Sequence, residues 1–229
     1  MNSCYRVIWS ARHKQWVVAS EITAGHGRGA SILVSLAVSL PLAVHGADIS
    51  KGLTGFNPRE GQVQFLQGNT PSEAVLKQVT DKAVIDWQGF SLPQGTSLQF
   101  VQPGASSMAL NRVTGPQASV LDGTLTGNGQ VWLINPNGVL IGSQGRINVH
   151  GFLASTLAVS NDDFMQGRYQ FNAISSAQGG VFNNGVIQTL PSGYAVLAGQ
   201  RVENTGLIQA YLGKVALGAA EQFTLSVSG

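Results

Sequence analysis

Apolar residues along most of this chain fall in short runs of four to six, separated by Gly, Asn or Ser. Runs of this length that are bounded by turn-forming residues are typical of β-strands. Residues 81–87 (DKAVIDW) and 96–101 (TSLQFV) are two such predicted strands, and Leu98 and Phe100 alternate with polar residues in the second. No stripe at the 3.6-residue spacing of an amphipathic helix accompanies these runs. The pattern therefore predicts an all-β protein.

The C-terminal third of the chain repeats itself. Residues 181–188 (VFNNGVIQ) align with residues 202–209 (VENTGLIQ) at an offset of 21. Just downstream, residues 193–198 align with residues 213–218 at an offset of 20. A repeat of this length with two or three strands cannot bury its apolar face alone, whereas stacked repeats bury a continuous core.

Further upstream, residues 145–147 align with residues 185–187 at an offset of 40, which we take as support for a unit of about 20 residues. A unit of this size has the length of one coil of a right-handed parallel β-helix, in which each coil adds about 4.8 Å. Leucine-rich repeats share the length, but their leucine pattern is missing. Residues 57–80 are more polar and hold no clean repeat, and we expect residues 47–80 to form an N-terminal β cap over the open end of the stack.

Asn and Gly recur at the corners of the predicted coils. Gly138, Gly185 and Gly206 each follow Asn or Thr, and we expect a positive φ at all three. Asn183 and Asn204 occupy the same place in successive units. They are either members of an amide ladder between coils or ordinary turn residues, and the sequence supports both interpretations equally.

The N-terminal region reads as a leader and not as part of the fold. Residues 30–44 form an apolar run without charge, which is short for a membrane span and typical of the h-region of a signal peptide. Small residues follow, and we predict cleavage between Gly46 and Ala47, so that residues 1–46 are removed and residues 47–229 remain. An N-terminal membrane anchor is the alternative. Nearly thirty residues precede the apolar run, although a whole signal peptide usually spans about 15–30 residues.

Removal of the leader changes the charge of the protein. The whole chain has a formal net charge of +2, from 13 Lys and Arg and 11 Asp and Glu. Four basic residues and one acidic residue precede residue 47, so the remaining part is close to −1. We therefore expect no nucleic-acid partner. The single cysteine, Cys4, also lies in the leader, so the exported part has no disulfide and is held by its core and its backbone hydrogen bonds.

The segment from Val131 to Gly142 (VWLINPNGVLIG) places a strong turn between two apolar runs. Pro136 presets φ for the second position of a β-turn, and Asn137 and Gly138 suit the positions that follow. The Asn135 side chain can bond the backbone within the turn. The flanking apolar faces are supplied by Val131, Leu133, Val139 and Ile141. Such a sequence would form a good corner in any β-fold.

Residues with the chemistry of a catalytic or metal site are sparse. Asp162 and Asp163 are the only adjacent acids, and they read as a solvated loop with little support for a Ca²⁺ site. His150 has no partner at ligand spacing. The glycine-rich stretch at residues 25–29 follows no strand and lies in the leader, so it is not a phosphate loop. We therefore expect no catalytic residue, no metal site, no cofactor and no enzymatic activity.

Several phrases of the sequence occur in the order found in a known family. They are FVQP at residues 100–103, ALNRV at 109–113, NGQVWLINPNGVLIG at 128–142 and LAST at 153–156. With these phrases the chain resembles the N-terminal secretion domain of filamentous-haemagglutinin-type exoproteins, the passengers of two-partner secretion in Gram-negative bacteria. The leader, with YRVIW at residues 5–9, is similar to the extended signal-peptide region of this family.

The resemblance implies a function in export. A member of this family crosses the inner membrane by the Sec machinery, and its N-terminal domain is recognised in the periplasm by an outer-membrane transporter with POTRA domains. It is then secreted to the cell surface. The family domain is a right-handed β-helix with an N-terminal cap, and its NPNG motif corresponds to Asn135, Pro136, Asn137 and Gly138. The family's separate NPNL motif is missing, and residues 109–112 are its counterpart region.

Two functional hypotheses remain. The first is the secretion domain of a large adhesin-like exoprotein, truncated here at residue 229. The second is a self-contained adhesive β-helix that binds host glycans or host proteins directly. Within the first, we expect the NPNG turn to act mainly by fixing a corner of the stack, and less by touching the transporter, because each of its residues already has a steric task.

Overall fold

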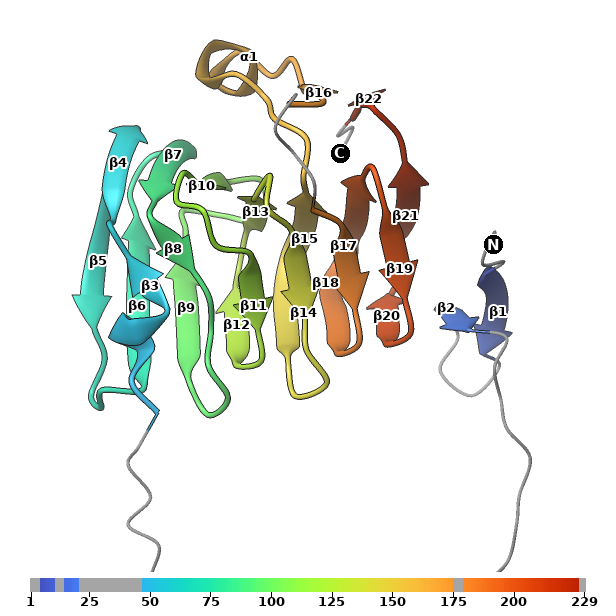
Figure 1. Cartoon of the computed structure of the whole chain (residues 1–229), viewed down its shortest axis with the longest axis horizontal. Helices are drawn as coiled ribbons and strands as arrows, with labels where there is room; N and C mark the ends of the chain where they lie inside the picture. Colours follow the sequence, from blue (N-terminus) through green and yellow to red (C-terminus); the bar gives the residue numbers. More distant parts are fainter. Residues whose placement is uncertain (1–4, 11–14, 21–46, 175–178, 227–229) are drawn as a thin grey trace, which may run out of the picture.

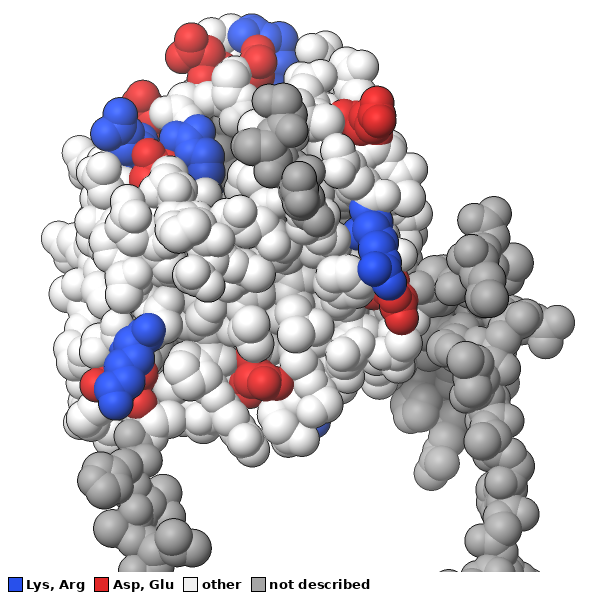
Figure 2. Space-filling model, in the orientation of Figure 1, with Lys and Arg blue, Asp and Glu red and all other residues white. Residues whose placement is uncertain are grey.

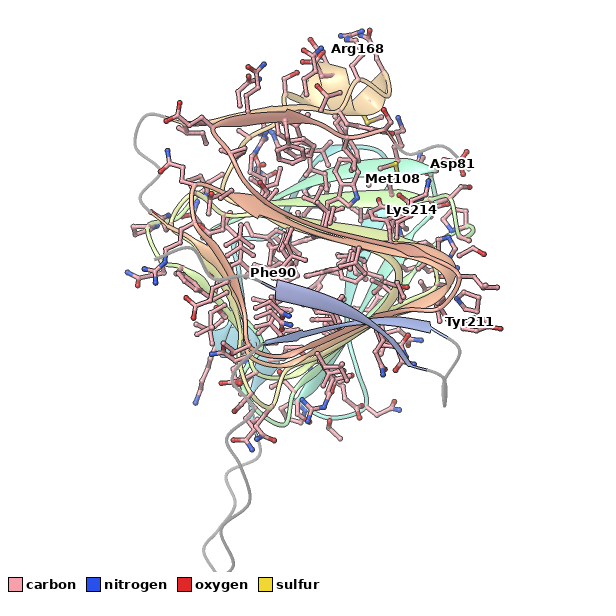
Figure 3. All side chains as sticks on the ribbon, turned by 90° about the vertical axis from the view of Figure 1, so that its right-hand side faces the viewer. Asp81, Phe90, Met108, Arg168, Tyr211 and Lys214 are labelled. Carbon is pink, nitrogen blue, oxygen red and sulfur yellow. The ribbon has the colours of Figure 1, made fainter. Side chains whose placement is uncertain are left out.

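The chain is described by a computed structural model, which covers residues 5–10, 15–20, 47–174 and 179–226. It is a right-handed parallel β-helix in which successive coils stack from left to right in Figure 1. Viewed along the stack, the coils enclose an interior filled with side chains (Figure 3). Three faces of parallel strands surround this interior, and we number them in the order in which the chain visits them in each coil.

The first face is built from strands that pair in parallel, each with the strand one coil away. Its members are β6 (Glu73–Gln78), β9 (Ser97–Val101), β12 (Thr124–Gly127), the first half of β15 (Arg146–Ser155), the first half of β18 (Val186–Gly199) and β20 (Leu207–Ala210). The strand predicted at residues 96–101 is thus present as β9. Leu98 and Phe100 point inward and are fully buried, while Gln99 and Val101 between and after them are exposed.

The second face continues the same sheet, because β15 and β18 are long enough to bend from one face into the next. Its members are β7 (Lys82–Trp87), β10 (Met108–Val113), β13 (Gln130–Ile134), the second halves of β15 and β18, and β21 (Lys214–Ala219). The third face is a separate sheet of short parallel strands. It contains β11 (Ser119–Leu121), β14 (Val139–Ile141), β17 (Val181–Asn183) and β19 (Val202–Asn204).

An N-terminal β cap closes one end of the stack with antiparallel strands. The 3-10 turn η1 (Ile49–Lys51) leads into β3 (Leu53–Thr54), which pairs with β8 (Gly89–Phe90). β4 (Asn57–Glu60) pairs with β7, and β5 (Val63–Gln67) pairs with β6. The ring of Trp87 lies within 5.7 Å of the rings of Phe56, Phe65 and Phe90, so an aromatic cluster plugs the interior beneath this cap.

A second hydrophobic core lies outside the β-helix, on the second face. Outward-pointing residues of successive strands form one apolar row: Val84, Leu110, Trp132, Leu153 and Val196. An excursion between β15 and β17 covers this row with α1 (Asn161–Met165) and with β16 (Gln170–Asn172), which pairs with β22 (Gln222–Thr224). The excursion stands at the top of the molecule in Figure 1. We call this layer the outer core.

The structure confirms two of the repeats and corrects the third. Val181 pairs with Val202, and Ala195 pairs with Val215, as the offsets of 21 and 20 predict. Ile147, however, pairs directly with Ile187, so the offset of 40 is one coil and not two. The extra length is the excursion that builds the outer core, which the repeat spacing alone does not distinguish from another coil.

The expected positive φ is present at Gly138, with a value of 117°, but absent at Gly185 and Gly206. At those two positions the requirement is space. A Cβ on Gly206 would overlap the carbonyl oxygen of Gly185, and a Cβ on Gly185 would overlap that of Gly142. Corners of successive coils therefore stack so closely that only glycine fits.

Two strands of the leader region, β1 (Tyr5–Ser10) and β2 (Gln15–Ser20), form an antiparallel hairpin whose second strand pairs with β20. Within the described ranges, no helix has the length and apolar character needed to cross a membrane. Charged side chains are few on the side of the molecule in Figure 2, and several of them gather at the top, near α1.

Candidate functional site

The NPNG turn connects the second face to the third, between β13 and β14. β13 is buried along its whole length because it has a core on each side. Val131 and Leu133 point into the interior of the β-helix, as the sequence predicts, while Trp132 and Ile134 point into the outer core. The two cores therefore hold the strand that enters the turn in a single register.

The turn has the geometry that its residue order predicts. The Gly138 N–H donates to the Asn135 carbonyl at 3.0 Å, which closes a four-residue turn with Pro136 and Asn137 in its centre. The Asn137 N–H donates to Asn135 Oδ1 at 2.9 Å. Gly138 then leaves the turn at a positive φ, which a side chain would strain.

The turn is bonded to the coil before it. The Asn135 side chain is fully buried, and its amide donates to the Gln117 carbonyl at 2.9 Å and to Ser119 Oγ at 3.0 Å. The Asn137 amide donates to the Gly115 carbonyl at 3.0 Å. Both side-chain amides of the motif are thus used within the protein. Asn135 satisfies both of its N–H donors in this way, whereas Asn137 satisfies one and leaves the rest of its exposed side chain to solvent.

The turn is also bonded to the coil after it. The Val139 N–H donates to the Gly180 carbonyl at 3.0 Å, and the Gly179 N–H donates to the Pro136 carbonyl at 3.2 Å. A Cβ on Gly179 would overlap the backbone of Gly138, so the next coil can approach the turn only as glycine. The motif is therefore a corner that is hydrogen-bonded to both the preceding and the following coil.

The outer surface of the turn is small. Asn137 is exposed and Pro136 is partly exposed, while Asn135 and Gly138 are buried. A shallow recess of about 230 Å³ lies beside the turn, and Arg201 crosses it with its guanidinium 5.1 Å from the centre of the Phe182 ring. The recess is lined by Asn137, Leu140, Phe182 and Arg201 among others. Asn137 and Arg201 are its polar side chains, and both can make polar contacts at the surface.

The Asn ladder, one of the two interpretations that the sequence supports, is present. Asn183 Nδ2 donates to Asn204 Oδ1 at 2.7 Å across adjacent coils, and both residues are fully buried. Asn183 Oδ1 also accepts from the Gly185 N–H at 3.1 Å, so the residue is a turn residue as well. Asn183 is therefore both a member of the amide ladder and a turn residue.

Buried amides elsewhere were missed by the sequence reasoning. Asn111 accepts from Trp87 Nε1 at 3.0 Å and donates to the Trp132 carbonyl at 3.2 Å, which links three coils inside the protein. Gln102 donates to Gln78 Oε1 at 3.1 Å. Both residues lie in phrases that carry the family resemblance, ALNRV and FVQP, so the phrases themselves were the available signal.

Side chains of the predicted counterpart region at residues 109–112 make contacts within the fold. Arg112 forms an ion pair with Asp86 at 2.7 Å and donates to Asn161 Oδ1 at 2.9 Å. Arg59 of the cap approaches the other oxygen of Asp86 at 3.5 Å. This cluster joins the cap, the second face and α1.

Asp162 and Asp163 begin a helix and not a loop, which corrects the prediction. The Ser160 side chain accepts from the Asp163 N–H at 3.1 Å as the N-cap of α1. In the sequence this capping signal spans only the four residues 160–163. Hydrogen bonds from Ser160 and Arg168 hold the pKa of Asp163 below its usual value. Among the residues that the structure describes, no three His, Cys, Asp or Glu gather in a way that could hold a metal ion.

The predicted cleavage site falls at the edge of the described residues. Gly46 lies outside the described residues, and Ala47 is the first residue of the described range that leads into the cap. Cleavage between the two stays a prediction.

Comparison with known proteins identifies both parts of the chain. Residues 55–228 match the model of the TPS secretion domain, and residues 1–47 match the Extended Signal Peptide of Type V secretion system. Among solved structures, the HMW1 secretion domain from Haemophilus influenzae is 33% identical with a TM-score of 0.71, over 76% of this chain and 46% of that one. The filamentous hemagglutinin secretion domain has a TM-score of 0.56 at 19% identity, over 76% of this chain and 65% of that one, which shows a shared fold.

Curated relatives point to the same class of protein. A heme/hemopexin-binding protein of Haemophilus influenzae strain Rd is 38% identical over 69% of this chain, and a second Haemophilus influenzae protein of that name is 42% identical over 46%. This chain spans 18% and 11% of their lengths. The extended signal peptide and the secretion domain together indicate export through Sec to the cell surface or beyond. The chain belongs to the TPS secretion domain family of two-partner secretion exoproteins.

Proposed function

We propose that this domain is recognised in the periplasm by an outer-membrane transporter with POTRA domains, and that it then nucleates the folding of the β-helix that follows it. The observation that carries the second part is the C-terminal end of the stack, where β2 pairs with β20 on the first face and the other two faces end in strands with a free edge among the described residues. Among the described strands, β19 and β21 each have a partner on one side only, β17 and β18. Their free backbone groups are a template for a further parallel coil.

The apolar side chains at this end favour the same proposal. Val215 and Leu217 are in line with the fully buried Ala195 and Leu197 of the preceding coil, yet they are only partly buried themselves. A further coil would cover them and would gain the hydrophobic free energy of that burial. Stepwise burial of this kind gives the emerging chain a direction of folding without nucleotide hydrolysis.

Within this proposal, the NPNG turn contributes through the fold. Asn135 and Asn137 use their amides on backbone carbonyls of the preceding coil, and Gly138 supplies the φ that the corner needs. The transporter then recognises a correctly stacked domain, and loss of the turn lowers export because the stack is impaired.

The test compares two variants of the full chain that is exported by cells carrying its transporter. Gly138→Ala strains the buried backbone, whereas Asn137→Ala removes an exposed amide. We expect Gly138→Ala to lower the free energy of unfolding by about 1–3 kcal/mol and Asn137→Ala by about 1 kcal/mol. Export should fall in the same order.

The measurements are the amount of protein at the cell surface and urea unfolding of the purified chain. Transporter-deleted cells are the control for recognition, and they should retain the chain in the periplasm. A variant Asn137→Ala with unchanged stability and abolished export would show direct contact instead. Equal surface levels with and without the transporter would overturn the whole proposal.

A further inference from the structure

The first face carries a row of polar, uncharged side chains that export does not explain. The central outward positions of five consecutive strands are in register, each paired with the next. They are Gln99, Thr126, Asn148, Gln188 and Gln209. Neighbouring members are separated by one coil, which is about 4.8 Å. We call the first four of these residues the amide row.

The side chains of the amide row differ from the buried amides of the same protein. Asn183 and Gln102 each donate to a side-chain amide in an adjacent coil, at 2.7 and 3.1 Å. By contrast, no side chain of the amide row has a hydrogen-bond partner among residues 47–174 and 179–226, and Gln99, Asn148 and Gln188 are exposed. Their donors and acceptors are therefore available to a ligand, and they stand on a rigid sheet that fixes their spacing.

A recess of about 410 Å³ lies in this face, across three coils. Gln99 and Asn148 line it from two strands, and Thr126 lies on the strand between them. The amides are thus two coils apart, which is about 10 Å. Val101, which is 40% exposed, and Leu190 add apolar surface beside the polar row.

The chemistry of this recess fits a neutral glycan. A sugar ring presents hydroxyl groups that both donate and accept, and a side-chain amide or hydroxyl matches both functions. The ring also has an apolar C–H face, which Val101 and Leu190 can cover. No Asp, Glu, Lys or Arg lines the recess, so it has no charge to hold a phosphate or an acidic sugar. The recess is also open to solvent, whereas a site for an acyl chain would enclose it.

We propose that the amide row on the first face binds an extended neutral polysaccharide, with its chain running across the coils and one sugar seated between Gln99 and Asn148. Such binding adds to the export role and does not depend on it. Loss of glycan binding would leave export intact, and loss of export would leave binding by the purified chain intact.

The test is a titration of the purified exported chain with neutral hexasaccharides of β-1,4-glucose, β-1,3-glucose and β-1,4-N-acetylglucosamine. Binding is measured by isothermal titration calorimetry and by NMR. We expect one of the three to bind, with an affinity that does not change with salt. Gln99→Ala and Asn148→Ala should each weaken it by about fivefold, the value of one hydrogen bond. Gln64→Ala is the matched control, because Gln64 is an exposed strand amide on β5, outside the recess.

Each other outcome overturns the proposal. These outcomes are the absence of binding by all three hexasaccharides, binding that survives both recess substitutions, and binding that Gln64→Ala weakens equally. Binding only to charged glycans, with a steep dependence on salt, would place the site elsewhere. A protein that copurifies with the wild-type chain and is lost in Asn148→Ala, with no glycan bound, would show that this face is a protein-docking surface.

Discussion

The NPNG turn follows directly after β13, and the outer core packs on β13 itself, yet the two regions are stabilised by different interactions. Asn135 is fully buried and satisfies its amide with the Gln117 carbonyl and Ser119 Oγ. Three residues earlier, Trp132 is equally buried but packs its ring against Phe164 and Tyr169, at 5.4 and 4.9 Å. Directional hydrogen bonds dominate the first site and aromatic packing the second.

The comparison separates the two tasks of a coil in this fold. Hydrogen bonds at the corner join residues of adjacent coils, so they fix the register of the stack. Packing in the outer core joins the second face to the excursion. A hydrogen bond adds to this packing: Lys82 on β7 donates to the carbonyl of Phe164, which is 82 residues later in the sequence, at 2.9 Å. We therefore expect a substitution at the corner to destabilise the adjacent coils as well. In the outer core, a substitution on the side of β13 should have a large effect, and one on the far side, in β22, a small effect.

The largest effect is expected where the outer core touches β13 itself. Trp132→Ala removes the ring that three aromatic residues of the excursion contact, and it also removes the donor to the Tyr194 hydroxyl at 2.7 Å. The free energy of unfolding should fall by about 3–5 kcal/mol, as for other large-to-small changes in a core. Urea unfolding of the purified chain measures it.

Trp132→Phe is the control for this prediction. It keeps most of the apolar volume and loses only the indole N–H, so it should lower the free energy of unfolding by about 1–2 kcal/mol. If Trp132→Ala lost less than this, the excursion would be a loosely attached cover and not part of a core.

An intermediate effect is expected at the third face. Asn183→Ala removes the donor to Asn204 Oδ1 and the acceptor of the Gly185 N–H, both of them buried. Loss of buried hydrogen bonds of this kind costs about 2 kcal/mol. Thermal unfolding should show the loss, whereas Asn184→Ala, which changes the exposed neighbour, should leave the melting temperature within about 2 °C. Equal shifts for the two variants would show that the ladder does not stabilise the stack.

Much of the β-helix could be predicted because its physics is local and repeated. The in-register pairs Val181–Val202 and Ala195–Val215 follow from the offsets in the sequence, and the turn at Asn135–Gly138 follows from the φ preferences of its residues. These features need no information from distant parts of the chain.

The outer core could not be predicted in the same way. Trp132 and Leu110 alternate with inward-pointing residues, so the alternation alone places them on the outside of the coil, and only the excursion makes them a core. The excursion is joined to the second face by contacts of high sequence separation, which no pattern reveals. For the same reason, the offset of 40 between Ile147 and Ile187 was indistinguishable from two coils.

The smallest effect is expected at the far side of the outer core, in β22. Phe223 stacks on Phe171 with ring centres 4.3 Å apart, but it is only partly buried. Phe223→Ala should lower the free energy of unfolding by about 1 kcal/mol, because the lost contact is one stacked pair with solvent on one side. Hydrogen exchange should become faster at the backbone of β16, which pairs with β22, and stay unchanged at β14 and β17 of the corner. Faster exchange at β14 to the same extent would show that the corner and the outer core open as one cooperative unit, and the separation of their two tasks would be wrong.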